Sequence, residues 1–344
     1  MNKKLIVVAV AGALALPMAA NAGGKVKTYG AMHVAVERIS VGDGDAQLSM
    51  NSSSRKGNRL GIKGSKDTNV ADFKAVFQFE AGLNMEDTHA KTGINSGKPT
   101  TGLYFQRDSW VGLSSKSMGT VRAGTMATSY KQSGAKLDPL FTTGAEGRGA
   151  INIMSATMHA GVGDGRGRSA HTVRYDSPSI AGAKVIVDYN IVAGGAGDNF
   201  GAGVHWKNGP AKAFFDYQSI HADTFGTGDD VNAMKFGGAY TVAGFTIGAQ
   251  YEIDGGAISK NKDGTQNMLF VTASYKMGST TFIVNGGMAD EKTDGAKNDN
   301  TSYVVAVSQA VAKKTGIYVG YAGTSGGDKH NEVSALIAGM TAKF

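Results

Sequence analysis

Apolar and polar residues alternate along many stretches of this chain. The clearest stretch is residues 245–254, in which apolar Phe245, Ile247, Ala249, Tyr251 and Ile253 alternate with Thr246, Gly248, Gln250, Glu252 and Asp254. A period of two places successive side chains on opposite faces of a β-strand. The same pattern recurs in residues 73–80, 184–191 and 200–207. Each of these segments is therefore predicted to be a strand with one apolar and one polar face.

Sixteen strands are predicted from this alternation. They begin near Lys25, Lys56, Phe73, Leu103, Gly119, Ala170, Lys184, Phe200, Ala211, Val231, Phe245, Asn267, Thr280, Thr301, Thr315 and Glu332. Each has roughly 9 to 13 residues, more than the five or six that are usual in soluble domains and about the length of a tilted strand that crosses a bilayer.

The links between these strands alternate between short and long. The short links are residues 67–69, 116–118, 178–181, 208–210, 243–244, 278–279 and 312–314. The long links are residues 39–55, 83–101, 128–169, 192–198, 221–230, 254–265, 290–299 and 323–331. This order is typical of an up-and-down barrel with both chain ends on the short-turn side. The prediction is an all-β fold, a closed 16-stranded antiparallel transmembrane β-barrel without free sheet edges.

The first 22 residues resemble a cleavable leader. Lys3 and Lys4 precede an apolar run over residues 5–16, and Ala20-Asn21-Ala22 follows Pro17. A basic start, a short apolar run and an A-x-A site are typical of a secretory signal peptide. The run is shorter than the roughly 20 residues that a transmembrane helix needs. We therefore expect residues 1–22 to be a signal peptide and residues 23–344 to be a single barrel domain.

Composition excludes several other classes of protein. The chain contains no Cys, which excludes disulfide scaffolds, zinc ribbons and thiol nucleophiles, and its 50 Gly among 344 residues are too many for a helical bundle. The formal net charge of +7 is dispersed along the chain, so nucleic acid is not an expected partner. The His residues show no paired ligand spacing, and no metal or cofactor is predicted.

Several motifs resemble one known family. They are Asn58-Arg59-Leu60-Gly61-Ile62-Lys63-Gly64-Ser65, Trp110-Val111-Gly112-Leu113 followed by Gly119-Thr120-Val121-Arg122-Ala123-Gly124, Val173-Arg174-Tyr175-Asp176-Ser177-Pro178, and the ending from Gly339 to Phe344. In this order they resemble the general diffusion porins of the Gram-negative outer membrane. The resemblance implies a homotrimer of barrels among outer-membrane lipid and lipopolysaccharide. It also implies that the third long loop, residues 128–169, folds into each lumen.

Sixteen strands make a barrel too wide for side chains to fill, so the lumen is expected to hold water. Alternation along the strands predicts lumen-facing cations at Lys27, Arg59, Lys63, Lys74, Arg174, Lys184 and Lys212, and the resemblance adds Arg122. Acidic partners are expected on the long loop, at Asp138, Glu146 and Asp164. The same loop also carries Lys131, Lys136, Arg148, Arg166 and Arg168. A weak anion preference or near-neutral selectivity follows from this balance.

The function predicted is passive diffusion of ions and small hydrophilic solutes, without catalysis. An adhesin or receptor that acts through its long outer loops is an alternative. An outer-membrane hydrolase is another, but residues 323–327 match the G-x-S-x-G pattern only within a Gly-rich link between two strands, where the strand-to-helix elbow of that motif does not form. Single-channel recording distinguishes these three functions.

Overall fold

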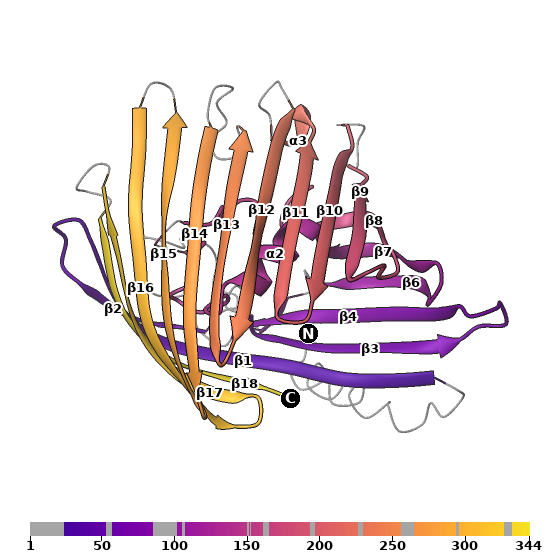
Figure 1. Ribbon diagram of the computed structural model, residues 1–344, viewed down its shortest axis with the longest axis horizontal. Helices are drawn as coiled ribbons and strands as arrows, with labels where there is room; N and C mark the ends of the chain where they lie inside the picture. Colours follow the sequence, from indigo (N-terminus) through magenta and orange to yellow (C-terminus); the bar gives the residue numbers. More distant parts are fainter. Residues whose placement is uncertain are drawn as a thin grey trace, which may run out of the picture.

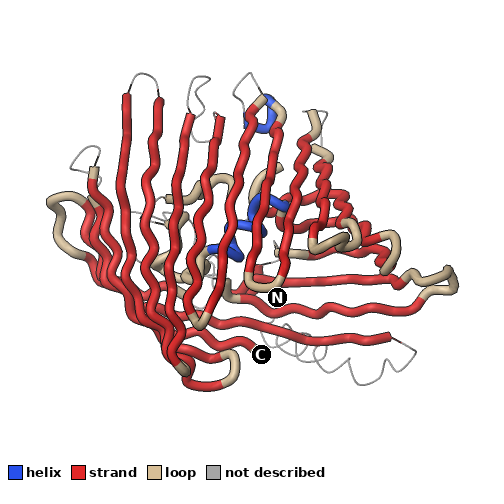
Figure 2. Tube along the Cα trace, viewed as in Figure 1, coloured by secondary structure: helices blue, strands red, loops and turns tan. Residues whose placement is uncertain are grey.

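The strands of the described residues form one continuous antiparallel sheet (Figures 1 and 2). The computed structural model describes residues 24–52, 57–84, 102–104, 107–149, 151, 153–160, 165–192, 197–225, 230–255, 265–293, 296–326 and 332–344. The predicted leader, residues 1–22, and the loop residue Asp164 lie outside these ranges.

Strands and helices alternate with turns along the described chain. The first nine strands are β1 (Gly24–Val41), β2 (Gln47–Asn51), β3 (Arg59–Asp67), β4 (Lys74–Asn84), β5 (Gly102–Tyr104), β6 (Ser109–Ser115), β7 (Gly119–Ala127), β8 (Arg168–Asp176) and β9 (Ala183–Asn190). The other nine are β10 (Asn199–Asn208), β11 (Ala211–Ile220), β12 (Val231–Val242), β13 (Phe245–Gly255), β14 (Thr265–Met277), β15 (Thr280–Thr293), β16 (Ala296–Ala312), β17 (Thr315–Ser325) and β18 (Val333–Lys343). The helices are α2 (Ser129–Leu137) and α3 (Ala222–Phe225).

Pairing between the first and the last strand closes the sheet into a ring. One edge of β1 pairs with β18, and its other edge pairs first with β3 and then with β2. Since β2 and β3 lie end to end along β1, they occupy one position in the ring. In the same way, β5 and β6 both pair with β4 and occupy one position. The ring formed by the described strands thus has sixteen positions, which confirms the predicted fold class.

The break between β2 and β3 is bridged by a side chain. Asn58 Oδ1 accepts a hydrogen bond from the backbone N–H of His33 at 2.5 Å, and Asn58 Nδ2 donates to the His33 carbonyl at 3.1 Å. Ser52 Oγ also donates to this carbonyl, at 2.8 Å. These bonds replace the ladder partner that His33 on β1 lacks at the break, because buried backbone groups need partners.

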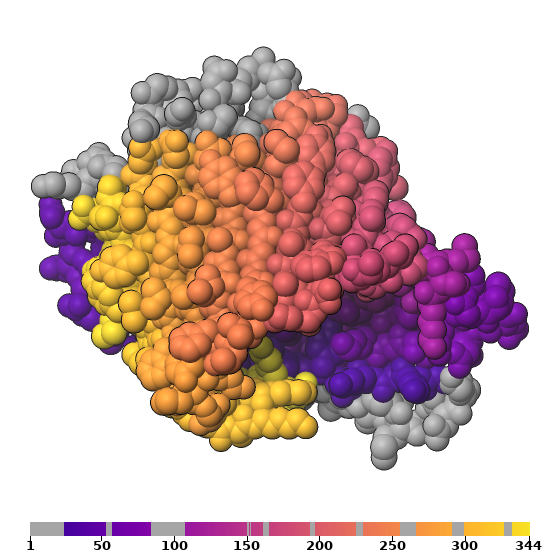
Figure 3. Space-filling model, in the orientation of Figure 1, coloured from indigo at the N-terminus to yellow at the C-terminus, as the bar shows by residue number. Residues whose placement is uncertain are grey.

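Burial in the barrel is inverted relative to a soluble protein. Val111 and Ile247 are 66% and 64% exposed, whereas Lys235 and Glu252 are both 0% exposed. The exposed apolar residues sit on one face of each strand, and the strands β10 to β17 form a continuous outer wall (Figure 3). Such a surface is favourable in lipid and costly in water. The observed arrangement agrees with the apolar-out, polar-in faces expected from the alternation.

The links follow the predicted order with one exception. The predicted long link over residues 290–299 is wrong, because β15 runs to Thr293 and β16 begins at Ala296. In this segment Ala289 pairs with Asn300 and Asp290 pairs with Asp299. Backbone pairing extends the hairpin through a segment whose sequence is mostly polar. Polar composition alone therefore did not indicate where the strands end.

Both ends of the described chain lie on the short-turn side. Gly24 pairs with Lys66, next to the short link between β3 and β4. The backbone of Phe344 exchanges two hydrogen bonds with Gly30, at 3.2 and 3.1 Å. The final apolar row continues the exposed face of β18 through Leu336, Met340 and Phe344.

The link from β7 to β8, residues 128–167, contains α2. Thr128 is the N-cap of this helix, and its side chain accepts a hydrogen bond from the N–H of Lys131. The helix contacts β9 to β13, and Figure 1 shows its ribbon behind β11 to β13. No helix in the described ranges is long and apolar enough to span a membrane.

Candidate functional site

The first turn of α2 is held by acidic side chains of the wall. Asp216 on β11 accepts hydrogen bonds from Ser129 Oγ and Ser133 Oγ, both at 2.5 Å, and lies 2.9 Å from His205 Nε2. Asp188 on β9 accepts from the N–H of Ser129 at 3.3 Å. A helix N-terminus carries partial positive charge, so carboxylates stabilise it. The polar face of β9 to β11 therefore fixes the start of the helix.

Tyr130 provides a second attachment. Its hydroxyl lies 3.0 Å from Glu252 Oε2 and 2.9 Å from Asp254 Oδ1, both on β13. Lys235 on β12 donates to the backbone carbonyl of Tyr130 and lies with its Nζ 4.1 Å from the centre of the Tyr130 ring. All four side chains are buried, so the link is anchored by charge-assisted hydrogen bonds shielded from water.

His159, in the same link, is constrained to its neutral form. Its Nδ1 lies 2.8 Å from the Ser155 carbonyl and its Nε2 lies 3.1 Å from Lys235 Nζ. Lysine has no acceptor, so Nε2 accepts from Nζ and the proton resides on Nδ1. Burial lowers the pKa of His159 well below its usual value, and the charge of Lys235 lowers the pKa further.

An apolar surface supports the rest of the link. Its buried members are Leu137, Leu140, Ala145, Ile151, Ile153 and Met154 from the link, and Ala35, Phe214, Phe270, Ile283, Val304, Ala306, Tyr318, Ala322, Ala335 and Ile337 from the wall. These wall residues occupy the face on which polar side chains were expected. The signal in the sequence was weak but present: segments such as residues 282–284 and 304–307 are continuously apolar and do not alternate.

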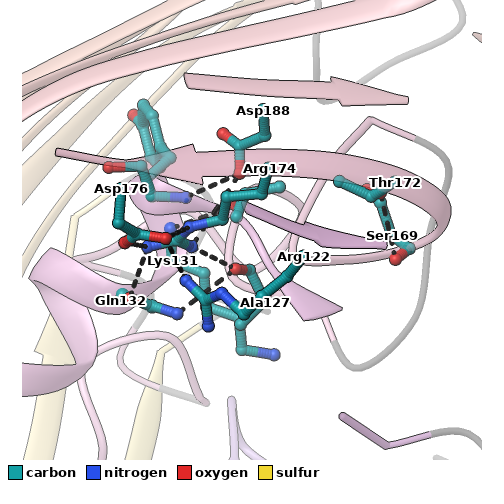
Figure 4. A network of polar contacts seen from close by, with 12 residues as sticks. Arg122, Ala127, Lys131, Gln132, Ser169, Thr172, Arg174, Asp176 and Asp188 are labelled. Carbon is teal, nitrogen blue, oxygen red and sulfur yellow. Dashed lines mark hydrogen bonds and ion pairs between the residues drawn. The ribbon is translucent and has the colours of Figure 1, made fainter. Parts of the chain in front are cut away.

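Two arginines converge on Asp176 of β8 (Figure 4). Arg122 on β7 pairs with its carboxylate, and the guanidinium carbon of Arg122 lies 5.0 Å from the centre of the Trp110 ring. Arg174 pairs with the other oxygen at 2.8 Å and donates to the carbonyl of Ala127 at 2.8 Å and to Gln132 Oε1 at 3.1 Å. Arg174 is 1% exposed and ties the link to β8, whereas Arg122 retains partial exposure.

A second charged group forms on β1, β3 and β4. Glu80 Oε2 lies 3.4 Å from Arg59 Nε, and Glu80 Oε1 lies 2.5 Å from Arg107 Nε. Tyr29 donates its hydroxyl proton to Glu80 at 2.9 Å, and Lys63 Nζ lies 5.1 Å from the centre of the Tyr29 ring. The structure thus brings the predicted residues Arg59 and Lys63 together. Alternation did not identify Arg107, which lies just before β6 begins.

The two acidic loop residues predicted for the lumen, Asp138 and Glu146, are buried. Asp138 accepts from the N–H groups of Leu140 and Gly147 at 2.8 and 2.9 Å and from Asn285 Nδ2 at 3.1 Å. Burial raises the pKa of Asp138 to about 6. Both carboxylates serve the internal packing of the link, because Glu146 likewise accepts from the N–H of Thr142 at 2.7 Å and pairs with Arg148 at 3.0 Å.

Four other predicted lysines remain. Lys27 lies opposite Lys63 in the ladder between β1 and β3, and Lys212 Nζ donates to the carbonyl of Lys136 at 2.9 Å. Lys74 and Lys184 lie apart from these groups. Lys74 pairs with Asp67 at 2.7 Å beside the short link between β3 and β4, and its side chain is half exposed. Lys184 is exposed on β9, where it faces His205 of β10. Sequence reasoning missed the acidic residues of the wall as anchors, although Glu252 and Asp254 lie on the polar face that it assigned. Within the described ranges, no group of three or more His, Asp or Glu could hold a metal ion.

Known proteins resemble this chain over most of its length. The family described as Gram-negative porin matches residues 7–329. The major outer membrane protein P.IB of Neisseria gonorrhoeae is 27% identical over 360 residues, which cover 95% of this chain and 94% of that protein. An outer membrane porin protein of Bordetella pertussis is 27% identical over 212 residues, which cover 54% of this chain and 49% of that protein.

Solved structures share the fold at low identity. OmpF of Salmonella typhi, in complex with daunomycin, superposes with a TM-score of 0.71 at 15% identity, covering 94% of this chain and 98% of that one. The trimer form of OmpT of Vibrio cholerae gives 0.64 at 14% identity, covering 94% and 100%. The matched proteins are named as outer-membrane proteins and porins, not as enzymes. Together with the closed apolar-out ring, the family match establishes that this chain belongs to the Gram-negative porin family and is a β-barrel protein of the outer membrane.

Proposed function

We propose that the barrel is a passive channel for ions and small hydrophilic solutes, narrowed by residues 128–167 folded into its lumen. The observation that carries the proposal is the contact of this link with the polar, inward faces of β9 to β13. A ring of sixteen strands leaves space that wall side chains cannot fill. The link fills part of that space on one side, and the basic wall on the other side remains accessible to water.

The charge along this accessible wall favours a weak anion preference. Its exposed or partly exposed cations are Lys27, Arg59, Lys63, Arg107 and Arg122. Exposed Lys136 on α2, exposed Lys184 on β9 and partly exposed Lys212 on β11 add positive charge on the side that the link contacts. The acidic wall residues Glu80 and Asp176 are each already paired with two arginines. The excess of fixed positive charge attracts anions, and pairing with the two carboxylates moderates it.

Reversal potentials across a planar bilayer in a salt gradient test both parts. The wild type is expected to show stepwise conductance. Its reversal potential should be small, with the sign that indicates preference for anions. Arg122→Ala should shift this potential toward cations, since it removes a positive charge beside Asp176. Lys66→Ala, which removes a charge from the outward face of β3, is the matched control. A folded barrel that never conducts would refute the channel, and an unchanged potential in Arg122→Ala would refute the role of Arg122.

The assembly and processing of the chain are also proposed. Trimers are supported by the trimer form of OmpT of Vibrio cholerae, which has the same fold. The exposed apolar belt supports contact with membrane lipid and lipopolysaccharide. The basic and apolar pattern of residues 1–22 supports removal of a signal peptide before the barrel, residues 23–344, is assembled.

A further inference from the structure

Four lysines lie near the C-terminal end of α2, close to the short turn that joins β10 and β11. Lys207 is the next-to-last residue of β10 and Lys212 is the second residue of β11, on either side of the turn at residues 209–210. Lys184 lies on the neighbouring strand β9, and Lys136 lies in the last turn of α2. Lys212 Nζ donates to the carbonyl of Lys136 at 2.9 Å, which connects the wall to the helix. We call these four residues the lysine cluster.

The strand lysines of the cluster point to the same side as the residues that hold α2. Lys207 is two residues from His205, which contacts Ser129 and Asp216. Lys212 is four residues from Asp216, and Lys184 is four residues from Asp188. Because side chains on one face of a strand recur every second residue, all three side chains lie on the inward face.

The cluster concentrates positive charge on neighbouring strands and on the end of α2. Lys207 and Lys212 are directly opposite each other in the ladder between β10 and β11. Like charges in that position are destabilising unless something offsets them. In the described part of the chain, none of the four lysines takes part in an ion pair. The nearest inward carboxylates already bind Ser129, Ser133 and the arginines.

The surroundings of Lys136 are crowded although its side chain reaches water. Partial burial lowers the pKa of Lys136, the charge of Arg174 lowers it further, and Lys184 adds to the effect, while Asp176 and Asp216 oppose it. Lys136 is exposed to solvent, yet charged side chains of the wall surround it. Its ammonium therefore lies in a confined, water-filled part of the lumen. Fixed charges act more strongly in such a space than on an open surface.

We propose that the lysine cluster is a binding subsite for small multivalent oxyanions, placed between the short-turn mouth and the narrow part of the channel. Each ammonium has three donors, and Lys212 uses one of them on the Lys136 carbonyl. The remaining donors converge from three strands and a helix on a ligand with several negatively charged oxygens. The inference rests on the proposed function, since it requires a conducting lumen.

A structural alternative applies to two of the four lysines, Lys136 in the last turn of α2 and Lys212 against its last carbonyls. The C-terminal end of a helix carries partial negative charge, so both lysines stabilise α2 whether or not an anion binds. Lys207 and Lys184 have no such contact with the helix. They are therefore the informative positions for substitution, and Lys207→Met also removes the repulsion across the β10–β11 ladder, so the barrel should fold.

Transient block of single channels by inorganic pyrophosphate, added to one side at a time, tests the subsite. For Lys207→Met and for Lys184→Met, the rate of block from one mouth should fall by about three-fold or more, because fewer charges focus the anion. The rate from the other mouth should stay close to that of the wild type. Lys66→Met, with the same charge loss on the outward face, should leave both rates unchanged.

Three results would overturn the subsite while leaving the channel intact. They are a wild type that conducts but is not blocked, rates unchanged in both lysine variants, and rates that fall equally from both mouths. The last result would mean that the lysines act only through the overall electrostatic potential of the pore and do not form a local binding site. A wild type that does not conduct would instead refute the proposed function itself. Folding of each variant is checked by circular dichroism before recording.

Discussion

Lys235 shows how single residues make a buried charge tolerable in this barrel. In the ladders it lies opposite Asp216 on β11 and opposite Glu252 on β13, so charges of alternating sign form a row across three strands. Its ammonium also donates to the carbonyl of Tyr130 and to His159. Burying an ion is costly unless it is paired and hydrogen-bonded. The hydrogen bonding of the Lys235 ammonium is therefore complete only when Tyr130 and His159 of the link are in place.

Tyr130→Phe should loosen this attachment. The substitution removes the hydroxyl that lies within hydrogen-bond distance of Glu252 and Asp254 while it keeps the ring against Lys235. The loss of a buried hydrogen bond to charged groups costs about 1.5–3 kcal/mol. We expect faster amide hydrogen exchange in α2 and larger fluctuations of the open-channel current.

Tyr217→Phe is the control for this prediction. Its hydroxyl bonds Asn232 on the exposed face, at 2.5 Å. It should alter neither the amide exchange in α2 nor the current. If Tyr130→Phe behaves like this control, Tyr130 does not anchor the link.

At the scale of elements, α2 depends on its surroundings. It has nine residues, including Ser129, Ser133 and Gly134. Helices of this length are marginal in water even with favourable sequences, and this sequence contains weak helix formers. Its stability comes from the cap at Thr128, from the carboxylates at its first turn and from the apolar surface around Leu137. The wall determines where the helix lies as well as whether it forms.

Gly134→Ala should weaken the packing of α2 against the wall, although alanine is the better helix former. Alanine gains about 1 kcal/mol from helix propensity. A Cβ at this position would lie 2.3 Å from His159 Nε2 and 3.0 Å from Lys235 Nζ. Moving those buried groups costs about 1–3 kcal/mol. We expect faster amide exchange in α2.

Gly286→Ala on β15 is the matched control, because its Cβ would meet only the Ser302 carbonyl, at 3.7 Å. Unchanged or slower exchange in Gly134→Ala would show that the close approach at Gly134 is not required.

At the scale of the whole molecule, the apolar belt keeps the barrel in the membrane. Val305 lies near the middle of β16 and is 52% exposed. Across the ladders it faces Val284 of β15 and Tyr321 of β17, both exposed as well. These residues meet lipid tails, while the inward residues meet water or the link. The sorting applies around the entire ring because closure leaves no free edge.

Val305→Lys should destabilise the folded barrel in lipid by about 2–4 kcal/mol, the cost of a cation on the lipid face near the midplane. Urea titration of folding into lipid vesicles measures this difference. Val305→Leu keeps the position apolar and should be nearly neutral. An equally small effect of both substitutions would indicate that residue 305 does not face hydrocarbon.

Much of this architecture was predictable from the order of residues. Alternation is a local property, since residues i and i+2 share a face whatever the rest of the chain does. Residues 245–254 therefore identified both faces of β13, and the order of links indicated a closed ring. The hairpin at residues 289–300 was missed because backbone pairing can continue through polar residues.

The charged site was predictable only in part, because it depends on contacts between distant segments. The inward direction of Arg59 and Lys63 follows from alternation, but the partners of Glu80 do not.

By itself, the sequence determined which face of each strand meets lipid and that the strands close into a ring. Only the tertiary structure decided how residues 128–167 use the inward face. It buried Asp138, Glu146 and Arg174 and left Lys207 opposite Lys212. The physical reason is that a strand's faces follow from neighbouring residues. The position of a link inside the barrel depends on wall side chains tens of residues away in the sequence. Those side chains come together only when the ring has closed.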